Sequence, residues 1–225
     1  MIITTRGIVF RFTKYRETSI ISNIYTEEFG LGTYIINGVR SAKSKIKIGY
    51  FEPLNLIEFT VYHKPGRNIE RITDIKSTHP IHSIRQNVYK SAISLFLVEL
   101  LNKCIIERDK NLPLFDYLYN AILTLEQAPQ NNNFHLQFML KLSSFIGFGI
   151  HEPTSFVKQS GNENYYKEAE TMRILQRLIE GELTDIPTLN TSQRTNILTD
   201  ILHYYQLKLE ITPLKSLEVL HTVFS

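Results

Sequence analysis

Residues 38–47 read GVRSAKSKIK and lie between two apolar segments, residues 34–36 (YII) and residues 50–51 (YF). The ten positions include no acid and four cations, Arg40, Lys43, Lys45 and Lys47. A basic loop between two apolar strands suits the binding of a phosphate backbone, because Lys and Arg neutralise its charges and release counterions. Lysines are also found in solvated connectors, where they keep a strand edge from pairing with other chains. The stretch alone favours neither interpretation, but both place a loop between two strands.

The segments on either side of this loop have the composition of short strands. β-Branched and aromatic residues dominate them, and turn residues such as Gly30 and Gly32 separate them. We expect five strands in the first third of the chain, near residues 8–12, 20–25, 33–39, 54–62 and 69–75. Short strands at this spacing, without a helix-length segment among them, predict a small closed barrel or a sandwich.

The hydrophobic period changes near Pro80, where apolar residues begin to recur at helical spacing. We expect helices over about residues 80–107, 113–125, 134–145, 169–179 and 192–205, with a short one after Pro213. Residues 151–166 carry no sustained period. The predicted fold class is therefore α+β, with a five-stranded β-barrel domain at residues 1–79 and an all-α domain at residues 80–225.

The composition is that of a soluble globular protein. The chain has 225 residues, of which 43% are hydrophobic and 21% are charged, which is enough for one large domain or two ordinary ones. No apolar run is long enough to cross a bilayer, and the N-terminus lacks the pattern of a signal peptide. The single cysteine, Cys104, can form no internal disulfide. These features favour the reducing environment of the cytoplasm.

Positive charge is concentrated in the predicted barrel. Residues 1–75 carry 11 Lys/Arg against 7 Asp/Glu, a net charge of +4, whereas residues 76–225 carry 14 against 15, a net charge of −1. Ten aromatic residues are interleaved with the cations of this first part, and we expect more than half of them to fill the barrel core. A basic barrel with aromatic rings suits single-stranded nucleic acid, since every base has a π-face. The predicted nucleic-acid contacts are Arg40, Lys43, Lys45, Lys47, Arg11, Lys14 and Arg16.

Motifs for catalysis or cofactor binding are missing from the sequence. There is no glycine-rich phosphate loop, and the two Gly-x-Gly pairs are better explained as a turn and a helix end. The seven histidines lack ligand spacing, and one cysteine cannot build a cysteine zinc site. A catalytic triad assembled from distant residues stays open. We expect a protein that is not an enzyme and that holds no metal or other cofactor.

Eight segments, spread along nearly the whole chain, form a series that matches a known family. They are residues 7–9 (GIV), 14–19 (KYRETS), 25–30 (YTEEFG), 38–41 (GVRS), 51–54 (FEPL), 114–118 (LFDYL), 147–149 (GFG) and 213–220 (PLKSLEVL). In this order they resemble the RecO family of bacterial recombination mediators. The resemblance implies an N-terminal OB-fold, which is a five-stranded barrel, followed by a C-terminal α-helical domain.

The resemblance also implies a function. Members of the RecO family bind single- and double-stranded DNA, anneal complementary strands and, with RecR, help to load RecA on DNA coated by single-strand-binding protein (SSB). They act without catalysis in the bacterial cytoplasm, at the nucleoid. Many members carry a cysteine-rich zinc motif near the position of residues 151–166, but this chain has no cysteine there, so the zinc site is not carried over. The alternative is an RNA-binding OB-fold protein in translation or RNA processing, because the same basic barrel would serve either polymer.

The predicted helical domain has no excess of positive charge, which suits protein contacts better than an independent grip on DNA. The resemblance implies that one partner is the acidic C-terminal tail of SSB, which ends in apolar side chains. Such a tail needs a groove between helices for its apolar end and a nearby cation for its carboxylate. The candidate cations are Lys141, Arg173 and Arg177, each of which is equally well explained as an ordinary solvated residue.

Overall fold

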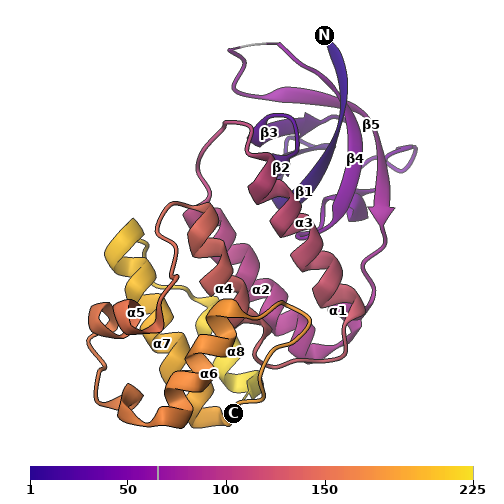
Figure 1. The fold of residues 1–225 in the computed structure, drawn as a ribbon. Helices are drawn as coiled ribbons and strands as arrows, with labels where there is room; N and C mark the ends of the chain where they lie inside the picture. Colours follow the sequence, from indigo (N-terminus) through magenta and orange to yellow (C-terminus); the bar gives the residue numbers. More distant parts are fainter. Residues whose placement is uncertain (65, 225) are drawn as a thin grey trace. The chain divides into compact units, whose positions relative to one another are not determined.

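The computed structural model describes residues 1–64 and 66–224 and divides the chain into two compact units (Figure 1). The first unit combines Met1–His82 with Ile105–Leu123, and the second combines Ser83–Cys104 with residues 124–224. The two units therefore do not simply follow one another along the chain. After residue 82 the chain enters the helical unit, returns to the barrel unit at residue 105, and leaves it again after residue 123.

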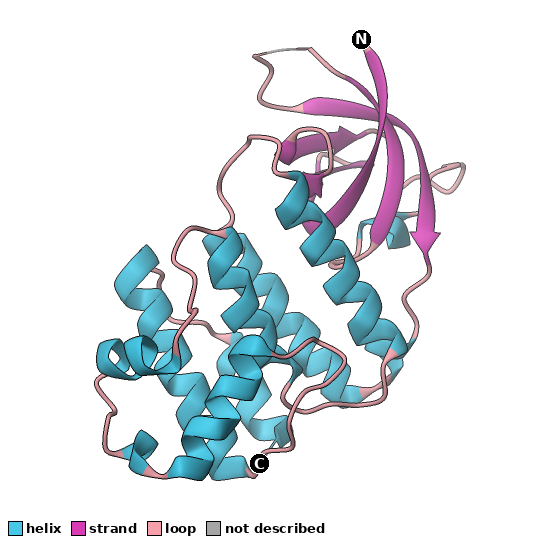
Figure 2. Cartoon of the chain, viewed as in Figure 1, coloured by secondary structure: helices cyan, strands magenta, loops and turns pink. Residues whose placement is uncertain are grey.

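Five strands, magenta in Figure 2, lie in the first unit and form a closed barrel in the order β1-β2-β3-β5-β4. Their bounds are β1 (Ile2–Tyr15), β2 (Ser19–Thr26), β3 (Gly30–Ile36), β4 (Leu56–Tyr62) and β5 (Glu70–His79). The long strand β1 makes closure possible, because its first half pairs with β4 and its second half with β2. All pairs are antiparallel except β3 with β5, which run parallel and pair at Tyr34–Glu70 and Ile35–Arg71. The predicted five-stranded barrel is confirmed.

The inside of the barrel is filled by alternate residues of its strands, as expected for a sheet with one face on a core. Its buried core consists of Val9, Ile20, Ile24, Tyr34, Ile36, Val39, Phe51, Ile57, Phe59, Val61, Ile72 and Ile75. Three more aromatic side chains, Phe12, Phe29 and Tyr50, pack against this core and are partly buried. Most of the aromatic residues before residue 75 therefore serve packing.

The outer face of β1 and β2 is covered by helix α3 (Leu112–Gln127), whose first twelve residues belong to the barrel unit. The rings of Phe10 and Tyr25 stack at 5.8 Å, and Tyr25 in turn stacks on Phe115 at 6.4 Å. Arg6 donates to both carboxylate oxygens of Glu27 at 2.7 and 2.8 Å, and its guanidinium lies over the rings of Phe115 and Tyr119. Stacked rings and a charge-assisted pair thus attach the helix to the barrel.

The described residues of the second unit form helices and the loops and turns that connect them, which confirms the predicted all-α part. Besides the end of α3, its elements are α1 (Ser83–Gln86), α2 (Val88–Cys104), α4 (Phe134–Phe145), α5 (Pro153–Ser160), the 3₁₀-helix η2 (Tyr165–Lys167), α6 (Ala169–Glu180), α7 (Thr191–Leu209) and α8 (Ser216–Phe224). Helix α4 is buried on almost every side. None of the helices in residues 1–64 and 66–224 is long and apolar enough to span a membrane.

Two details of this unit differ from the prediction. The single helix expected over residues 80–107 is broken at Asn87, whose side-chain oxygen accepts hydrogen bonds from the backbone N–H groups of Tyr89 and Lys90 and so caps α2. Residues 151–166, which show no helical period, contain the short helix α5. Pro153 stands in its first turn, where the missing N–H costs nothing, and only Phe156, Val157 and Ser160 are buried.

A single carboxylate holds the start of α8. Glu99 of α2 accepts hydrogen bonds from the backbone N–H groups of Lys215 and Ser216 and from the Ser216 hydroxyl. Partial burial raises the pKa of Glu99, but the hydrogen bonds from Ser216, Lys215 and Lys103 outweigh that effect and lower the pKa to about 2. A carboxylate from one helix therefore neutralises the free N–H groups at the start of another.

Candidate nucleic-acid interface

The basic stretch forms a loop, as predicted, but it leads from β3 into the 3₁₀-helix η1 (Ile48–Phe51) rather than directly into a second strand, and β4 begins only at Leu56. Val39 is buried in the barrel core, and Ile46 packs against that core, so both ends of the loop are anchored. Between them, the hydroxyl of Ser41 donates to the Gly38 carbonyl at 2.8 Å and the hydroxyl of Ser44 donates to the Ile46 carbonyl at 2.8 Å. The loop backbone is thus held by apolar anchors and local hydrogen bonds, while its cations point outward.

This loop is joined to the turn between β1 and β2. The backbone N–H of Arg40 donates to the Thr18 carbonyl at 2.9 Å, and the Arg40 guanidinium donates to the Arg16 carbonyl at 3.3 Å. Arg16 has a φ of 52°, and its own guanidinium lies over the Tyr15 ring. The structure therefore brings Arg16 and Arg40 together, with Lys14 just before the turn.

We call Lys14, Arg16, Arg40, Lys43, Lys45 and Lys47 the basic loop surface. All six side chains are exposed, and in the described part of the chain no carboxylate lies within ion-pair distance of any of them. Arg11, the seventh predicted contact, is exposed on β1 opposite Asn23, and no contact in the described residues joins it to the loop. Exposed cations that are not paired with a carboxylate are available to bind phosphates, and each contact with single-stranded nucleic acid adds roughly 0.7 to the slope of log K against log salt.

The three cations proposed for partner binding lie on two helices of the second unit. Lys141 of α4 is 3.9 Å from Glu182, and Arg177 of α6 is 3.6 Å from Asp185. Both acids belong to the turn that follows α6, where the Asp185 N–H donates to the Glu182 carbonyl. Arg173 is exposed one turn before Arg177. Two of the three cations are thus close to acidic side chains of one turn.

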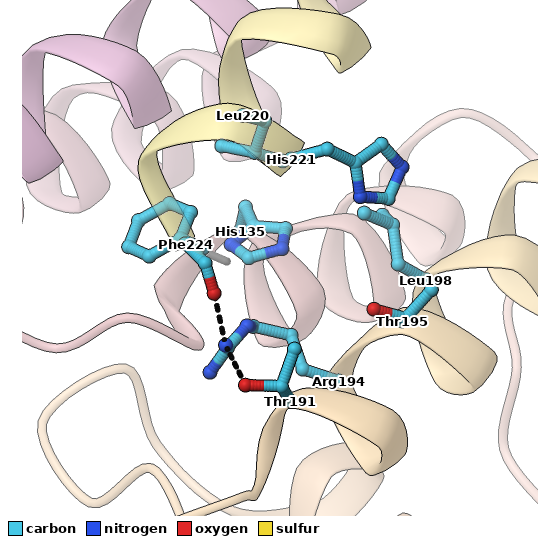
Figure 3. A pocket seen from close by; sticks show the side chains of 8 residues that line it. All are labelled: His135, Thr191, Arg194, Thr195, Leu198, Leu220, His221 and Phe224. Atoms are coloured by element: carbon cyan, nitrogen blue, oxygen red, sulfur yellow. Dashed lines mark hydrogen bonds between the residues drawn. The ribbon is translucent and has the colours of Figure 1, made fainter.

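A small cavity of about 50 Å³ in the helical unit is lined in part by His135 and Arg194, two residues that the sequence analysis did not select (Figure 3). The Arg194 guanidinium donates to the Phe224 carbonyl at 2.8 Å and to the Thr191 hydroxyl at 3.2 Å. Neither ring nitrogen of His135 has a hydrogen-bond partner among the described residues. Burial first, and then the charges of Arg194 and His221, lower the pKa of His135 to about 3. Because 59 residues separate the two positions, no local motif indicated this pair.

Metal ligands and thiols are two further kinds of site to look for in the described residues. Within residues 1–64 and 66–224, no group of three or more His, Cys, Asp or Glu side chains is placed to hold a metal ion. Cys104 is buried, and burial raises the pKa of its thiol to about 12, which suits a packing role better than a reactive one.

Comparisons with known proteins match the chain along its length. The profile of the family described as "Recombination protein O N terminal" matches residues 1–81, and that of "Recombination protein O C terminal" matches residues 85–153. The protein named DNA repair protein RecO from Bacteroides fragilis is 36% identical over 241 residues. Proteins of the same name from Phocaeicola vulgatus and Flavobacterium psychrophilum are 33% and 32% identical. Each of these alignments covers 100% of both chains.

The first family profile covers the β-barrel, and the full-length relatives cover both units. Because these alignments cover the whole chain, they span all eight segments that carried the resemblance in the sequence. The chain therefore belongs to the recombination protein O (RecO) family of DNA repair proteins.

Proposed function

We propose that this chain is a non-enzymatic mediator of DNA repair and homologous recombination. It binds single- and double-stranded DNA, promotes annealing of complementary strands and, with RecR, helps to load RecA on single-stranded DNA coated by SSB. Family membership supports this role, and one structural observation supports it at the residue level. Arg40 is hydrogen-bonded to the β1–β2 turn, so the structure joins exposed cations of two chain segments, and none of these cations has an ion-pair partner among the described residues.

Annealing places particular demands on such a surface. The protein must neutralise two phosphate backbones so that they approach each other, yet it must leave the base edges free to pair. Lysines and arginines on a surface loop contact phosphates from outside and read no sequence. The basic loop surface suits this task better than a deep groove that would enclose the bases.

The division of labour between the two parts of the chain belongs to the same proposal. The barrel domain, residues 1–79, binds DNA, and the helical domain, residues 80–225, contacts the SSB tail and RecR, with Lys141, Arg173 and Arg177 receiving the acidic tail. The protein then acts at the nucleoid in the bacterial cytoplasm. Titration with a labelled tail peptide, with and without its terminal apolar residues, tests this contact. Equal binding of both peptides would argue against an apolar groove.

The variant Arg40→Ala/Lys43→Ala/Lys45→Ala tests the DNA-binding part. We expect weaker binding to labelled single-stranded DNA and a slope of log K against log salt that is lower by roughly 2 units, about 0.7 for each lost contact. The matched control is Lys158→Ala/Lys167→Ala/Lys208→Ala, which removes three exposed cations from helices of the second unit. Circular dichroism confirms that both variants are folded.

Two outcomes would argue against the proposal. A slope that is unchanged in the folded loop variant would make the basic stretch a solvated connector. Tighter binding to RNA than to single-stranded DNA, at the same salt concentration and length, would favour the alternative of an RNA-binding protein.

A further inference from the structure

A second group of rings and cations lies in the barrel unit, beside the loop between β4 and β5. A cavity of about 130 Å³ opens there between the first part of β3, the described residues of that loop (63–64 and 66–69) and the segment that re-enters the unit at residue 105. The lining residues that matter to the argument are Phe29, His63, Lys64, Arg67, Glu70 and Arg108. We call this cavity the β4–β5 pocket.

The sheet topology explains why there is an opening at this place. Strand β3 begins at Gly30, but its parallel neighbour β5 pairs with it only at Tyr34 and Ile35. The first residues of β3 therefore have no strand on that side, and the β4–β5 loop lies along them instead. The Tyr34 side chain folds back over Gly32, where an added Cβ would be 2.4 Å from the hydroxyl oxygen. A glycine and a buried tyrosine thus form part of the wall.

The His63 ring of the pocket is held in place by contacts with Phe29, Met1 and Glu70. The Phe29 and His63 rings stack with a centroid distance of 4.4 Å and an interplanar angle of 14°. His63 exchanges backbone hydrogen bonds with Met1, and its Nδ1 lies 2.8 Å from Glu70 Oε1, close to it but not aligned as a hydrogen bond. The same Glu70 oxygen accepts the Lys64 N–H at 3.0 Å. The ring pair is therefore fixed before any ligand arrives.

Three exposed cations surround this ring pair. Lys64 and Arg67 come from the β4–β5 loop, and Arg108 comes from the re-entering segment. That segment is fastened to the barrel, because the Leu31 N–H donates to the Glu107 carbonyl and Lys110 pairs with Glu28 at 2.9 Å. In the part of the chain that the structure describes, no carboxylate lies within ion-pair distance of Lys64, Arg67 or Arg108.

We propose that the β4–β5 pocket binds one unstacked base of single-stranded DNA, with the Phe29–His63 pair as its stacking platform and Lys64, Arg67 and Arg108 as contacts to the flanking phosphates. Stacked aromatic rings beside cations are the combination that binds single strands without sequence preference. The size agrees, because about 130 Å³ is well below the roughly 300–1,000 Å³ of pockets that enclose whole drug-sized ligands. In this proposal one base occupies the cavity, and its sugar and phosphates lie at the rim.

This inference rests on the proposed function and adds a strand preference to it. A base inside a duplex is paired and stacked, and taking it out costs a few kcal/mol, whereas a single strand exposes its bases at little cost. The basic loop surface binds the backbone of either form. The β4–β5 pocket distinguishes them, so it should contribute to binding of single strands and little to binding of duplexes.

The test uses the full-length protein and labelled DNA of one length in three forms, namely single-stranded, single-stranded with abasic sites, and duplex. His63→Leu removes the aromatic ring and keeps an apolar side chain, whereas His63→Phe keeps an aromatic ring. We expect His63→Leu to bind the single strand roughly tenfold more weakly than the unsubstituted protein, and His63→Phe to bind it as before. Abasic DNA should bind equally to all three proteins.

A second variant, Lys64→Ala/Arg67→Ala, tests the phosphate contacts. Its salt slope for single-stranded DNA should fall by roughly 1.4 units, while the control Lys158→Ala/Lys167→Ala keeps the original slope.

If the unsubstituted protein binds single-stranded DNA and both pocket variants bind like their controls, the pocket inference is wrong and the proposed function stands. If the unsubstituted protein binds no DNA in any form, the proposed function fails and the pocket inference fails with it. Equal weakening on intact and abasic DNA by His63→Leu would show that the pocket holds no base.

Discussion

Acid should destabilise the helical unit through His135. The imidazole is fully buried between the Phe96 and Phe224 rings, at 5.9 and 6.0 Å, and the charged or titratable groups that face it are Arg194 and His221. Burial and these neighbours favour the neutral ring, so the pKa is lowered to about 3 in the folded protein, against about 6.5 in the unfolded chain. The unfolded state therefore binds the proton first, and stability falls as the pH falls.

The pH window and the magnitude follow from these two pKa values. The contribution of His135 is fully present above about pH 6.5 and is lost progressively as the pH falls toward about 3. Each pH unit inside that window costs about 1.4 kcal/mol. Going from pH 7.5 to pH 5 crosses about 1.5 units of the window, so the free energy of unfolding should fall by about 2 kcal/mol. Domains are stable by roughly 5–15 kcal/mol, so this loss is measurable.

The assay is urea unfolding followed by circular dichroism at both pH values, with His135→Phe as the test variant. Phenylalanine keeps a ring against Phe96 and Phe224 but cannot bind a proton, so the variant should lose about 2 kcal/mol less than the unsubstituted protein on acidification. His151→Gln removes an exposed imidazole instead and serves as the control. If His135→Phe loses as much stability as the unsubstituted protein, the buried imidazole does not titrate as argued, and the reasoning from its unpartnered nitrogens is refuted.

Three further substitutions test the packing and the hydrogen bonds described above. Gly30→Ala places a Cβ 2.3 Å from a backbone oxygen at a φ of +64°, whereas the Cβ of Gly38→Ala, at a φ of +70°, meets nothing within 4 Å. Gly30→Ala should therefore lower the free energy of unfolding by roughly 1–3 kcal/mol more than Gly38→Ala, and equal losses in urea unfolding would contradict this. Glu99→Gln weakens the charge-assisted hydrogen bonds at the start of α8 and should lower the free energy of unfolding by roughly 1.5–3 kcal/mol at neutral pH. Because the pKa of Glu99 is lowered to about 2, the difference in unfolding free energy between the two proteins should shrink as the pH falls below about 4.5. A difference that stays constant with pH would argue that the charge of Glu99 does not stabilise α8. Arg6→Met breaks the pair with Glu27, which has two short hydrogen bonds, and should destabilise the protein by roughly 1–3 kcal/mol in thermal or urea unfolding. Lys76→Met breaks an exposed pair and should have a much smaller effect. Equal effects would mean that the Glu27 pair and the ring contacts of Arg6 together contribute no more than an exposed pair.

Local signals in the sequence predicted the existence and type of the main elements. Strands rich in Val, Ile and aromatic residues were identified correctly, but β1 is longer than residues 8–12 indicate. Thr4 and Arg6 interrupt the apolar pattern there, although backbone pairing with β4 continues through them. The helix break at Asn87 was missed because the hydrophobic period continues across it. A side-chain cap stops the helix, and such a cap leaves little trace in periodicity.

The candidate site was predictable only in part, and for a similar reason. A run of cations without acids indicates an exposed loop, and Lys43, Lys45 and Lys47 are indeed exposed. The hydrogen bond from Arg40 to the turn after β1 joins positions that are 24 residues apart. The spacing of residues in the sequence does not reveal such a contact. The stacking of Phe29 on His63 is likewise a product of barrel closure. A binding site that combines residues from distant segments can be identified only once the fold shows which segments meet.

The return of residues 105–123 to the barrel unit has a consequence for the order of events during synthesis. Domains tend to fold as they leave the ribosome, N-terminal part first, at roughly 5–20 residues per second. Here the strands are complete at His79, yet the stacked rings of Phe10 and Tyr25 receive their cover only when Phe115 emerges. For several seconds at that rate the nascent barrel exposes an aromatic surface, on which chaperones or neighbouring nascent chains can act. A polypeptide ending at residue 79 would keep that surface permanently open, and fragments used to study the barrel alone should therefore extend through Leu123.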